Sequence, residues 1–242
     1  ASVGNYLIGK YIKENTDCKV IFNGDGADEL MGGYLYFKKS PNAYEFDNEC
    51  KRLLTDIYMF DVLRSDRCIS SHGLETRTPF LDRGWAEFYL SINKDLRYNT
   101  TKNNCEKYLI RKAYSEVCPD LLPKEILWRT KEAFSDGVSS LQRSWFQIIQ
   151  EKVENFTNID YDLINIQLIY KKMKTYKNPP TTKEQAYYRY LYNKDYLGTD
   201  HLIDYFWMPK YVNAKDASAR SLKCYAENNT NKLEIEEEIN MI

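Results

Sequence analysis

Acidic residues alternate with glycines directly after a short apolar run, a pattern that could bind phosphates and carry out acid–base chemistry. Residues 18–22 are rich in β-branched and aromatic side chains, which predicts a buried strand. Residues 23–28 read Asn-Gly-Asp-Gly-Ala-Asp, and a helical pattern begins at Ala27. The glycines allow positive φ or close approach of a ligand to the backbone. Asp25 and Asp28 are therefore expected at the carboxyl end of a strand, where open α/β sheets bind ligands.

This turn has two other interpretations. It could be a purely structural strand-to-helix turn with Asp28 in solvent. It could also be a calcium loop, but an EF-hand needs oxygen ligands at fixed positions and a glycine at the sixth, and no such register fits around Asp25.

Two further blocks follow in order, residues 72–82 (HGLETRTPFLD) and residues 127–137 (LWRTKEAFSDG). Together with residues 20–34, they resemble the synthetase domain of glutamine-hydrolysing asparagine synthetases. The resemblance covers nearly all of residues 1–225. Weaker matches lie between the blocks, at Tyr34 to Lys38, Asp61 to Arg67, Glu106–Lys107 with Arg111, and Trp207 to Lys210.

The resemblance implies an α/β fold, part of an adenine-nucleotide-hydrolase-like (PP-loop ATP pyrophosphatase) domain that is mostly helical in this chain. Residues 1–225 would form the carboxyl-terminal part of the synthetase domain. Residues 226–242, rich in Asn and Glu, would form a poorly ordered tail. In the family, a glutaminase domain and an "SGG.DS" phosphate-binding loop come earlier. This sequence contains neither, so we expect the chain to be inactive alone.

The resemblance also implies the reaction and its partners. ATP, with Mg²⁺, adenylates the side-chain carboxylate of aspartate, and ammonia from glutamine hydrolysis attacks the β-aspartyl-adenylate. The expected partners are aspartate, ATP, ammonia and the missing glutaminase domain. A homodimer is one assembly that the resemblance allows.

Site residues follow by position in the family motifs. Asn23 and Gly24 would contact ATP or pyrophosphate. Asp25 would act in adenylate formation and as a base, where many members have Glu. Asp28 would bind both the pyrophosphate and Mg²⁺, since hard cations prefer oxygen ligands. Lys131 would be the catalytic cation on the phosphates. Ser135 to Gly137 could close over phosphates or simply cap a helix.

Some assignments stay open. Asp61 and Arg64 could orient aspartate or form an ordinary i, i+3 pair. Arg77 and Asp82 could bind substrate or form a buried structural pair. Lys131 could be a solvated loop lysine. The whole chain could instead belong to another carboxylate-adenylating enzyme, such as a β-lactam-forming synthetase, or be a truncated, non-catalytic assembly domain.

Composition and cysteine spacing argue against several classes of binding partner and structural site. The 242 residues carry a net charge of −1, so there is no electrostatic case for binding nucleic acid or an anionic membrane. No apolar run reaches the roughly 20 residues that cross a bilayer. The six cysteines are scattered without a C-x-x-C pair, which argues against a zinc site or a disulfide scaffold. A reducing compartment, the cytoplasm, is the expected location.

Apolar spacing predicts the elements that position these blocks. Helices are expected over residues 3–15, 45–68, 105–117, 141–153 and 181–192. The last of these has Thr182 as its N-cap.

Overall fold

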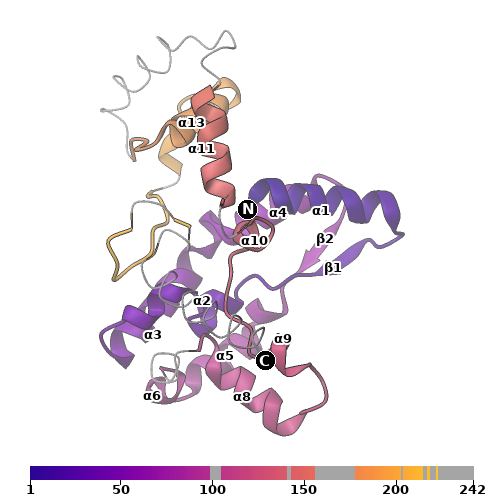
Figure 1. The fold of residues 1–242 in the computed structure, drawn as a ribbon, viewed down its shortest axis with the longest axis vertical. Coiled ribbons are helices and arrows are strands. Elements are labelled where there is room, and N and C mark those ends of the chain that lie inside the picture. The colour runs from indigo at the N-terminus through magenta and orange to yellow at the C-terminus, as the bar shows by residue number, and fades with distance from the viewer. Residues whose placement is uncertain are drawn as a thin grey trace, which may run out of the picture. The chain divides into compact units, whose positions relative to one another are not determined.

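The computed structural model describes residues 1–98, 105–140, 143–155, 178–202, 204–214, 217, 218 and 222, and these residues are mostly helical (Figure 1). The chain divides into two compact units. One comprises Ala1–Phe134 with Pro209–Ile242, and the other comprises Ser135–Met208. The first unit contains the glycine–aspartate turn.

The described part of the first unit consists of helices and two short strands. It begins with α1 (Ser2–Asn15), β1 (Val20–Phe22), α2 (Ala27–Met31), η1 (Leu35–Lys39), α3 (Ala43–Asp56), η2 (Ile57–Met59) and α4 (Asp61–Ser70). It continues with β2 (Glu75–Arg77), η3 (Pro79–Leu81), α5 (Arg83–Ser91), α6 (Lys94–Arg97), α8 (Tyr108–Val117) and α9 (Lys124–Leu127). The described elements that follow are α10 (Phe134–Gly137), α11 (Trp145–Asn155), α13 (Lys183–Asp195) and η5 (Asp200–Leu202).

β1 and β2 pair in parallel, with Val20 opposite Glu75 and Phe22 opposite Arg77 (Figure 1). The backbone N–H of Asn23 extends this pairing by donating to the Arg77 carbonyl at 2.9 Å. The strand at 18–22 is thus confirmed in its type, but its predicted burial is wrong, because Phe22 is 77% exposed. The reason is that the described part of the chain contributes only two strands to this sheet.

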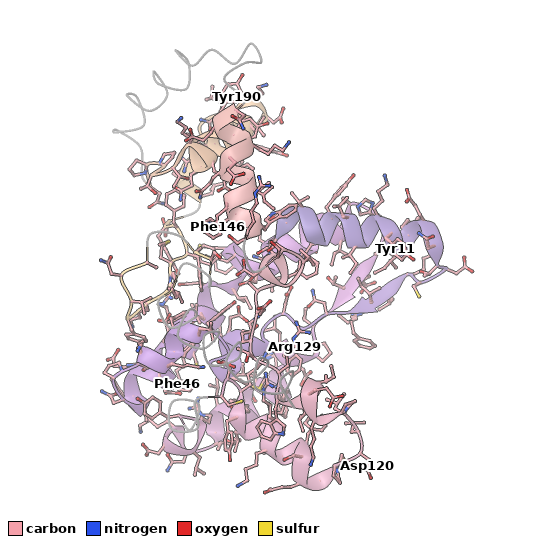
Figure 2. The ribbon with its side chains drawn as sticks, in the orientation of Figure 1. Tyr11, Phe46, Asp120, Arg129, Phe146 and Tyr190 are labelled. Carbon is pink, nitrogen blue, oxygen red and sulfur yellow. The ribbon has the colours of Figure 1, made fainter. Side chains whose placement is uncertain are left out.

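The apolar core of the first unit lies directly behind the turn. Leu30 and Met31 of α2 are fully buried against Tyr89 of α5. Burying a side chain of this size stabilises a fold by about 1.5–3 kcal/mol. A second group packs beside α3, where Phe46 (Figure 2) contacts the ring of Phe37 at a centroid distance of 5.1 Å. The turn is therefore supported by a packed apolar core.

The predicted helix over residues 45–68 is wrong as a single element. It breaks at Phe60, whose φ of −124° and ψ of −98° are not helical. α3 ends before this point and α4 begins after it, at Asp61. The amphipathic pattern does not reveal the break, because apolar residues continue at helical spacing on both sides of it. The new direction allows α4 to pack against α1 (Figure 1).

Other expected helices agree with the structure. α1 confirms the helix over 3–15, and α8 confirms the one over 105–117 from Tyr108 onward. Thr182 caps α13, accepting a hydrogen bond from the backbone N–H of Gln185 at 3.2 Å. α11 and α13 pack against each other within the second unit.

Several expectations lie outside what the structure describes. Leu141, the start of one predicted helix, and the tail at 226–242 are not among the described residues. That residues 1–225 form one domain stays a prediction. Within the described ranges, the chain has no helix with both the length and the apolarity to span a membrane.

Candidate active site

The side chain of Asn23 organises the turn after β1. Its Oδ1 accepts a hydrogen bond from the backbone N–H of Asp25 at 2.8 Å, and its Nδ2 donates to Asp25 Oδ2 at 2.9 Å. This is an Asx-type turn. Gly26 has a φ of +88°, and a Cβ there would lie 2.3 Å from Leu81, so only glycine suits the position. A Cβ on Gly24 would meet no atom within 4 Å, which leaves its peptide open to a ligand.

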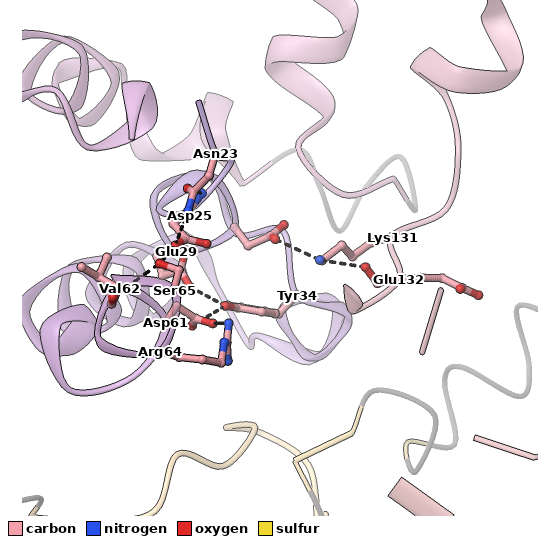
Figure 3. Close-up of polar contacts among 11 residues, drawn as sticks. Asn23, Asp25, Glu29, Tyr34, Asp61, Val62, Arg64, Ser65, Lys131 and Glu132 are labelled. Carbon is pink, nitrogen blue, oxygen red and sulfur yellow. Dashed lines mark hydrogen bonds and ion pairs between the residues drawn. The ribbon is translucent and has the colours of Figure 1, made fainter. Parts of the chain in front are cut away.

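Asp25 is held from a second direction by α4. The hydroxyl of Ser65 donates to Asp25 Oδ2, the same oxygen that Asn23 contacts (Figure 3). Ser65 is buried, at 3% exposure. Asp25 is partly buried, and the contacts with Asn23 and Ser65 hold its carboxylate in place.

Asp28 sits between two lysines. Its Oδ1 lies 2.9 Å from Lys107 Nζ, and its Oδ2 lies 3.0 Å from Lys131 Nζ. Burial alone would raise the pKa of Asp28, but the charges and hydrogen bonds of Lys131 and Lys107 outweigh it and lower the pKa. Gly33 makes room for this carboxylate, because a Cβ there would lie 2.0 Å from Asp28 Oδ1.

Lys131 lies in an irregular segment, as predicted, between α9 and α10. Besides Asp28, its ammonium donates to the carbonyl of Glu132 at 2.9 Å and lies 5.9 Å from the ring centre of Tyr34 (Figure 3). Its side chain is 19% exposed. The structure thus brings Lys131 to Asp28 and to the turn, which a fully solvated loop lysine would not show.

Behind the turn, the hydroxyl of Tyr34 joins two carboxylates. It contacts Glu29 and lies 3.1 Å from Asp61 Oδ2 (Figure 3). Burial and the negative charge of Asp61 raise the pKa of Glu29 to about 8. A hydroxyl has one proton to donate, so a protonated Glu29 lets both contacts be hydrogen bonds. Burial and the charge of Glu29 also raise the pKa of Tyr34 well above its usual value.

Asp61 and Arg64 form the i, i+3 ion pair that was one of the two open interpretations. The pair is not simply on the surface, because the side chain of Asp61 is 18% exposed and its other oxygen faces Tyr34. The structure therefore places both residues beside the turn. A role in binding substrate stays a prediction.

One other expected grouping differs from the structure. A buried pair between Arg77 and Asp82 is wrong: Arg77 is exposed and pairs with Glu75 at 2.7 Å, whereas Asp82 caps α5 by accepting from the Trp85 backbone N–H. The physical reason is that Asp82 sits at a helix start, where its oxygen satisfies a backbone donor. Ser135 to Gly137 lie in α10 and belong to the second unit, with Asp136 buried.

Sequence reasoning missed four residues as members of this site, namely Glu29, Tyr34, Ser65 and Lys107. All four lie in segments that match the family, Glu29 in the first block and the other three in the weaker matches. Ser65 lies in the weaker match at residues 61–67, but nothing in the local sequence marks it as a partner of Asp25, which is 40 positions away.

The described residues contain no group of three or more His, Cys, Asp or Glu side chains that could hold a metal ion by themselves. Mg²⁺ in nucleotide sites is held by one or two carboxylates while phosphates and water complete its shell. Asp28 can supply one such carboxylate. Both oxygens of Asp28 pair with lysines here, so Asp28 can hold a magnesium ion only when phosphates draw those lysines away, and its role as a metal ligand stays a prediction.

A strand that ends in a glycine–aspartate turn, with lysines gathered beside it, is typical of α/β proteins that act on phosphate-bearing ligands. Comparison with known proteins narrows this class. The family described as "Asparagine synthase" matches residues 1–46 and 38–191. The chain belongs to the asparagine synthase family.

Its relatives carry the name "Asparagine synthetase [glutamine-hydrolyzing]". The chain is 49% identical to the Gallus gallus protein over 226 residues, and 47% identical to the Mus musculus and Homo sapiens proteins over 225 residues. Each match covers 93% of this chain and 38% of the relative. The chain thus spans well under half the length of these relatives.

Proposed function

We propose that this chain supplies the carboxyl-terminal part of the synthetase site of a glutamine-hydrolysing asparagine synthetase. The reaction is ATP-dependent amidation of aspartate to asparagine. The observation that supports it most is the gathering of Asp25, Asp28 and Lys131 around one strand-to-helix turn, from segments up to about a hundred residues apart. Membership of the family supports the same conclusion.

The chemistry has two steps. A β-carboxylate oxygen of aspartate attacks the α-phosphorus of ATP, and pyrophosphate leaves to give β-aspartyl-AMP. Ammonia then attacks the activated carbonyl, AMP leaves with the C–O bonding electrons, and the nitrogen loses one proton. The products are asparagine, AMP, pyrophosphate and a proton.

Named residues would serve these steps. Lys131 would stabilise charge that grows on the departing pyrophosphate, which is the larger part of catalysis in phosphate chemistry. Asp25 would accept the proton from the attacking nitrogen. Gly24 would offer its backbone N–H to the nucleotide. Magnesium, when bound at Asp28, would neutralise phosphate charge.

The 242-residue chain alone should lack this activity, because its sequence contains no "SGG.DS" motif. Incubated with aspartate, ATP, Mg²⁺ and ammonia, it should release no pyrophosphate above background. Clear turnover would show that the motif is dispensable.

A chimera tests the proposed function itself. In it, this chain replaces the matching segment of the Gallus gallus relative. We expect pyrophosphate release that depends on aspartate. One asparagine should form for each pyrophosphate released, with either glutamine or ammonia as the nitrogen source. Activity with a different carboxylic acid and none with aspartate would favour another adenylating enzyme. A folded but inactive chimera that retains glutamine hydrolysis would favour a non-catalytic domain.

A further inference from the structure

One carboxylate in this site faces two ammonium groups that come from different segments. Lys107 lies at the start of α8 and Lys131 lies between α9 and α10, yet each contacts its own oxygen of Asp28, at 2.9 and 3.0 Å. All three side chains are about one-fifth exposed, with values of 19–20%. Two positive charges thus share one negative charge at a position that solvent can reach.

A second carboxylate beside Lys131, that of Glu106, already has a lysine partner of its own. Glu106 is 2% exposed and forms an ion pair at 2.7 Å with Lys38, which is itself 9% exposed. Its other oxygen accepts from the backbone N–H of Lys131 at 3.4 Å. Among these five charged groups, three lysines face two carboxylates.

The backbone of Lys107 supports a specific role. Lys107 has a φ of +56°, in the left-handed region that side-chain-bearing residues rarely adopt. Such conformations persist where surrounding contacts hold them, and they concentrate at ligand sites. Here the Lys107 carbonyl accepts from the Arg111 backbone N–H at 3.2 Å, which starts α8, while the ammonium is held on Asp28.

We propose that Lys107 is a second phosphate-binding cation, which pairs with Asp28 together with Lys131 and moves with it onto pyrophosphate when that group is present. The nature of the anion rests on the proposed function. The physical reason is competition: a pyrophosphate carries more negative charge and more acceptor oxygens than one carboxylate, and a lysine ammonium binds phosphate as a compact point charge.

The rival explanation is that Lys107 only ties α8 to α2. Both explanations predict that losing the ammonium affects stability. Only the first predicts that it affects affinity for a phosphate anion.

The test is calorimetric titration of the 242-residue chain with sodium pyrophosphate, in metal-free buffer of low ionic strength. Lys107→Met should weaken binding about tenfold or more, since a charge-assisted hydrogen bond is lost. Lys107→Arg should retain most of the affinity. Lys112→Met is the matched control, because Lys112 lies on α8, is exposed and pairs with Glu116 at 3.7 Å. It should bind like the wild type.

Asp28→Asn gives a result of opposite sign. Without the competing carboxylate, both ammonium groups are released and metal-free pyrophosphate should bind more tightly. This variant and Lys107→Arg carry the test if Lys107→Met does not fold, which a thermal melt will show. No measurable binding by the wild type, unchanged binding by a folded Lys107→Met, or weaker metal-free binding by Asp28→Asn would each overturn the proposal.

The outcome is separable from that of the proposed function. Lys107-dependent pyrophosphate binding together with an inactive chimera would reject only the asparagine-forming reaction. An active chimera whose chain binds pyrophosphate equally well with Lys107→Met would reject only the role of Lys107.

Discussion

The hydroxyl of Ser65 donates a hydrogen bond to the carboxylate of Asp25, although the two residues are 40 positions apart. Asn23 donates to the same oxygen from within the turn. Asp25 is therefore oriented by one local contact and one tertiary contact. The tertiary contact comes from α4, whose direction is set by the break between α3 and α4.

Ser65→Ala in the chimera should lower the turnover number about tenfold, because Asp25 loses one of two contacts that orient it. The Michaelis constant for aspartate should change less. Ser70→Ala is the control, since Ser70 is exposed on the same helix and its hydroxyl donates only to the Asp66 carbonyl among the bonds described. Steady-state pyrophosphate release measures both. Equal rates for the two variants would mean that Ser65 merely fills space.

Asp25→Asn should reduce adenylate formation by roughly 10²- to 10⁴-fold, the usual effect of losing one general base or one essential charge. Glutamine hydrolysis in the same chimera should be largely intact. The substitution keeps the size of the side chain and one acceptor oxygen, which can turn to face Asn23 and Ser65, so the fold should survive. Near-normal pyrophosphate release would reduce Asp25 to a turn residue.

Lys131→Ala should lower the turnover number by roughly 10²- to 10³-fold with little change in the apparent affinity for aspartate, because its contact with phosphate strengthens mainly in the transition state. Lys131→Arg should rescue this loss only in part, since a planar fork does not replace a compact ammonium. Pyrophosphate release as a function of aspartate concentration separates the cases. A change confined to the Michaelis constant would make Lys131 a ground-state binding residue.

Glu29 predicts a pH dependence of stability in the neutral range. Its pKa is raised from 4.5 to about 8 in the folded chain, chiefly by burial and then by Asp61. The folded state therefore binds more protons than the unfolded state between these values, so stability falls as the pH rises from about 4.5 and this loss is complete above about 8. The lowered pKa of Asp28 acts in the opposite sense and only in acid, where stability is lost as the pH falls below about 3.8.

Glu29→Gln should remove most of the decline near neutral pH, because an amide keeps the contact with Tyr34 without titrating. Free energies of unfolding from urea titrations at pH 5.5, 7.0 and 8.5 provide the measurement. The free energy of unfolding of the variant should increase relative to that of the wild type as the pH rises. A difference independent of pH would show that Glu29 is ionised throughout.

Gly33→Ala should destabilise the chain by about 1–3 kcal/mol, in the range of an overpacked site. The new methyl group would lie 2.0 Å from Asp28 Oδ1 and 3.0 Å from the Asp28 Cα, so the backbone as well as the side chain must shift. Gly24→Ala is the matched control, because its methyl group would meet no atom within 4 Å. Thermal melts of the two variants should differ clearly. Equal melting temperatures would mean that α2 adjusts freely.

The sequence by itself determined the local features of this protein. The glycine–aspartate turn, the helix starting at Ala27, the cap at Thr182 and the irregular segment around Lys131 all depend on neighbouring residues. Their physical causes, namely glycine φ, capping hydrogen bonds and apolar spacing, act within a few positions. The order of three motif blocks was also enough to indicate the family.

Only the tertiary structure decided which of these features meet. The pairing of Lys107 with Asp28 spans 79 positions, and that of Ser65 with Asp25 spans 40. In both pairs, nothing in the sequence around one residue indicates which residue it contacts. The break at Phe60 and the exposure of Phe22 were likewise invisible, because each depends on what packs against the segment and not on its own periodicity. A site assembled from distant segments is set by packing, since ion pairs and side-chain hydrogen bonds form only where the folded backbone brings their atoms to about 3 Å.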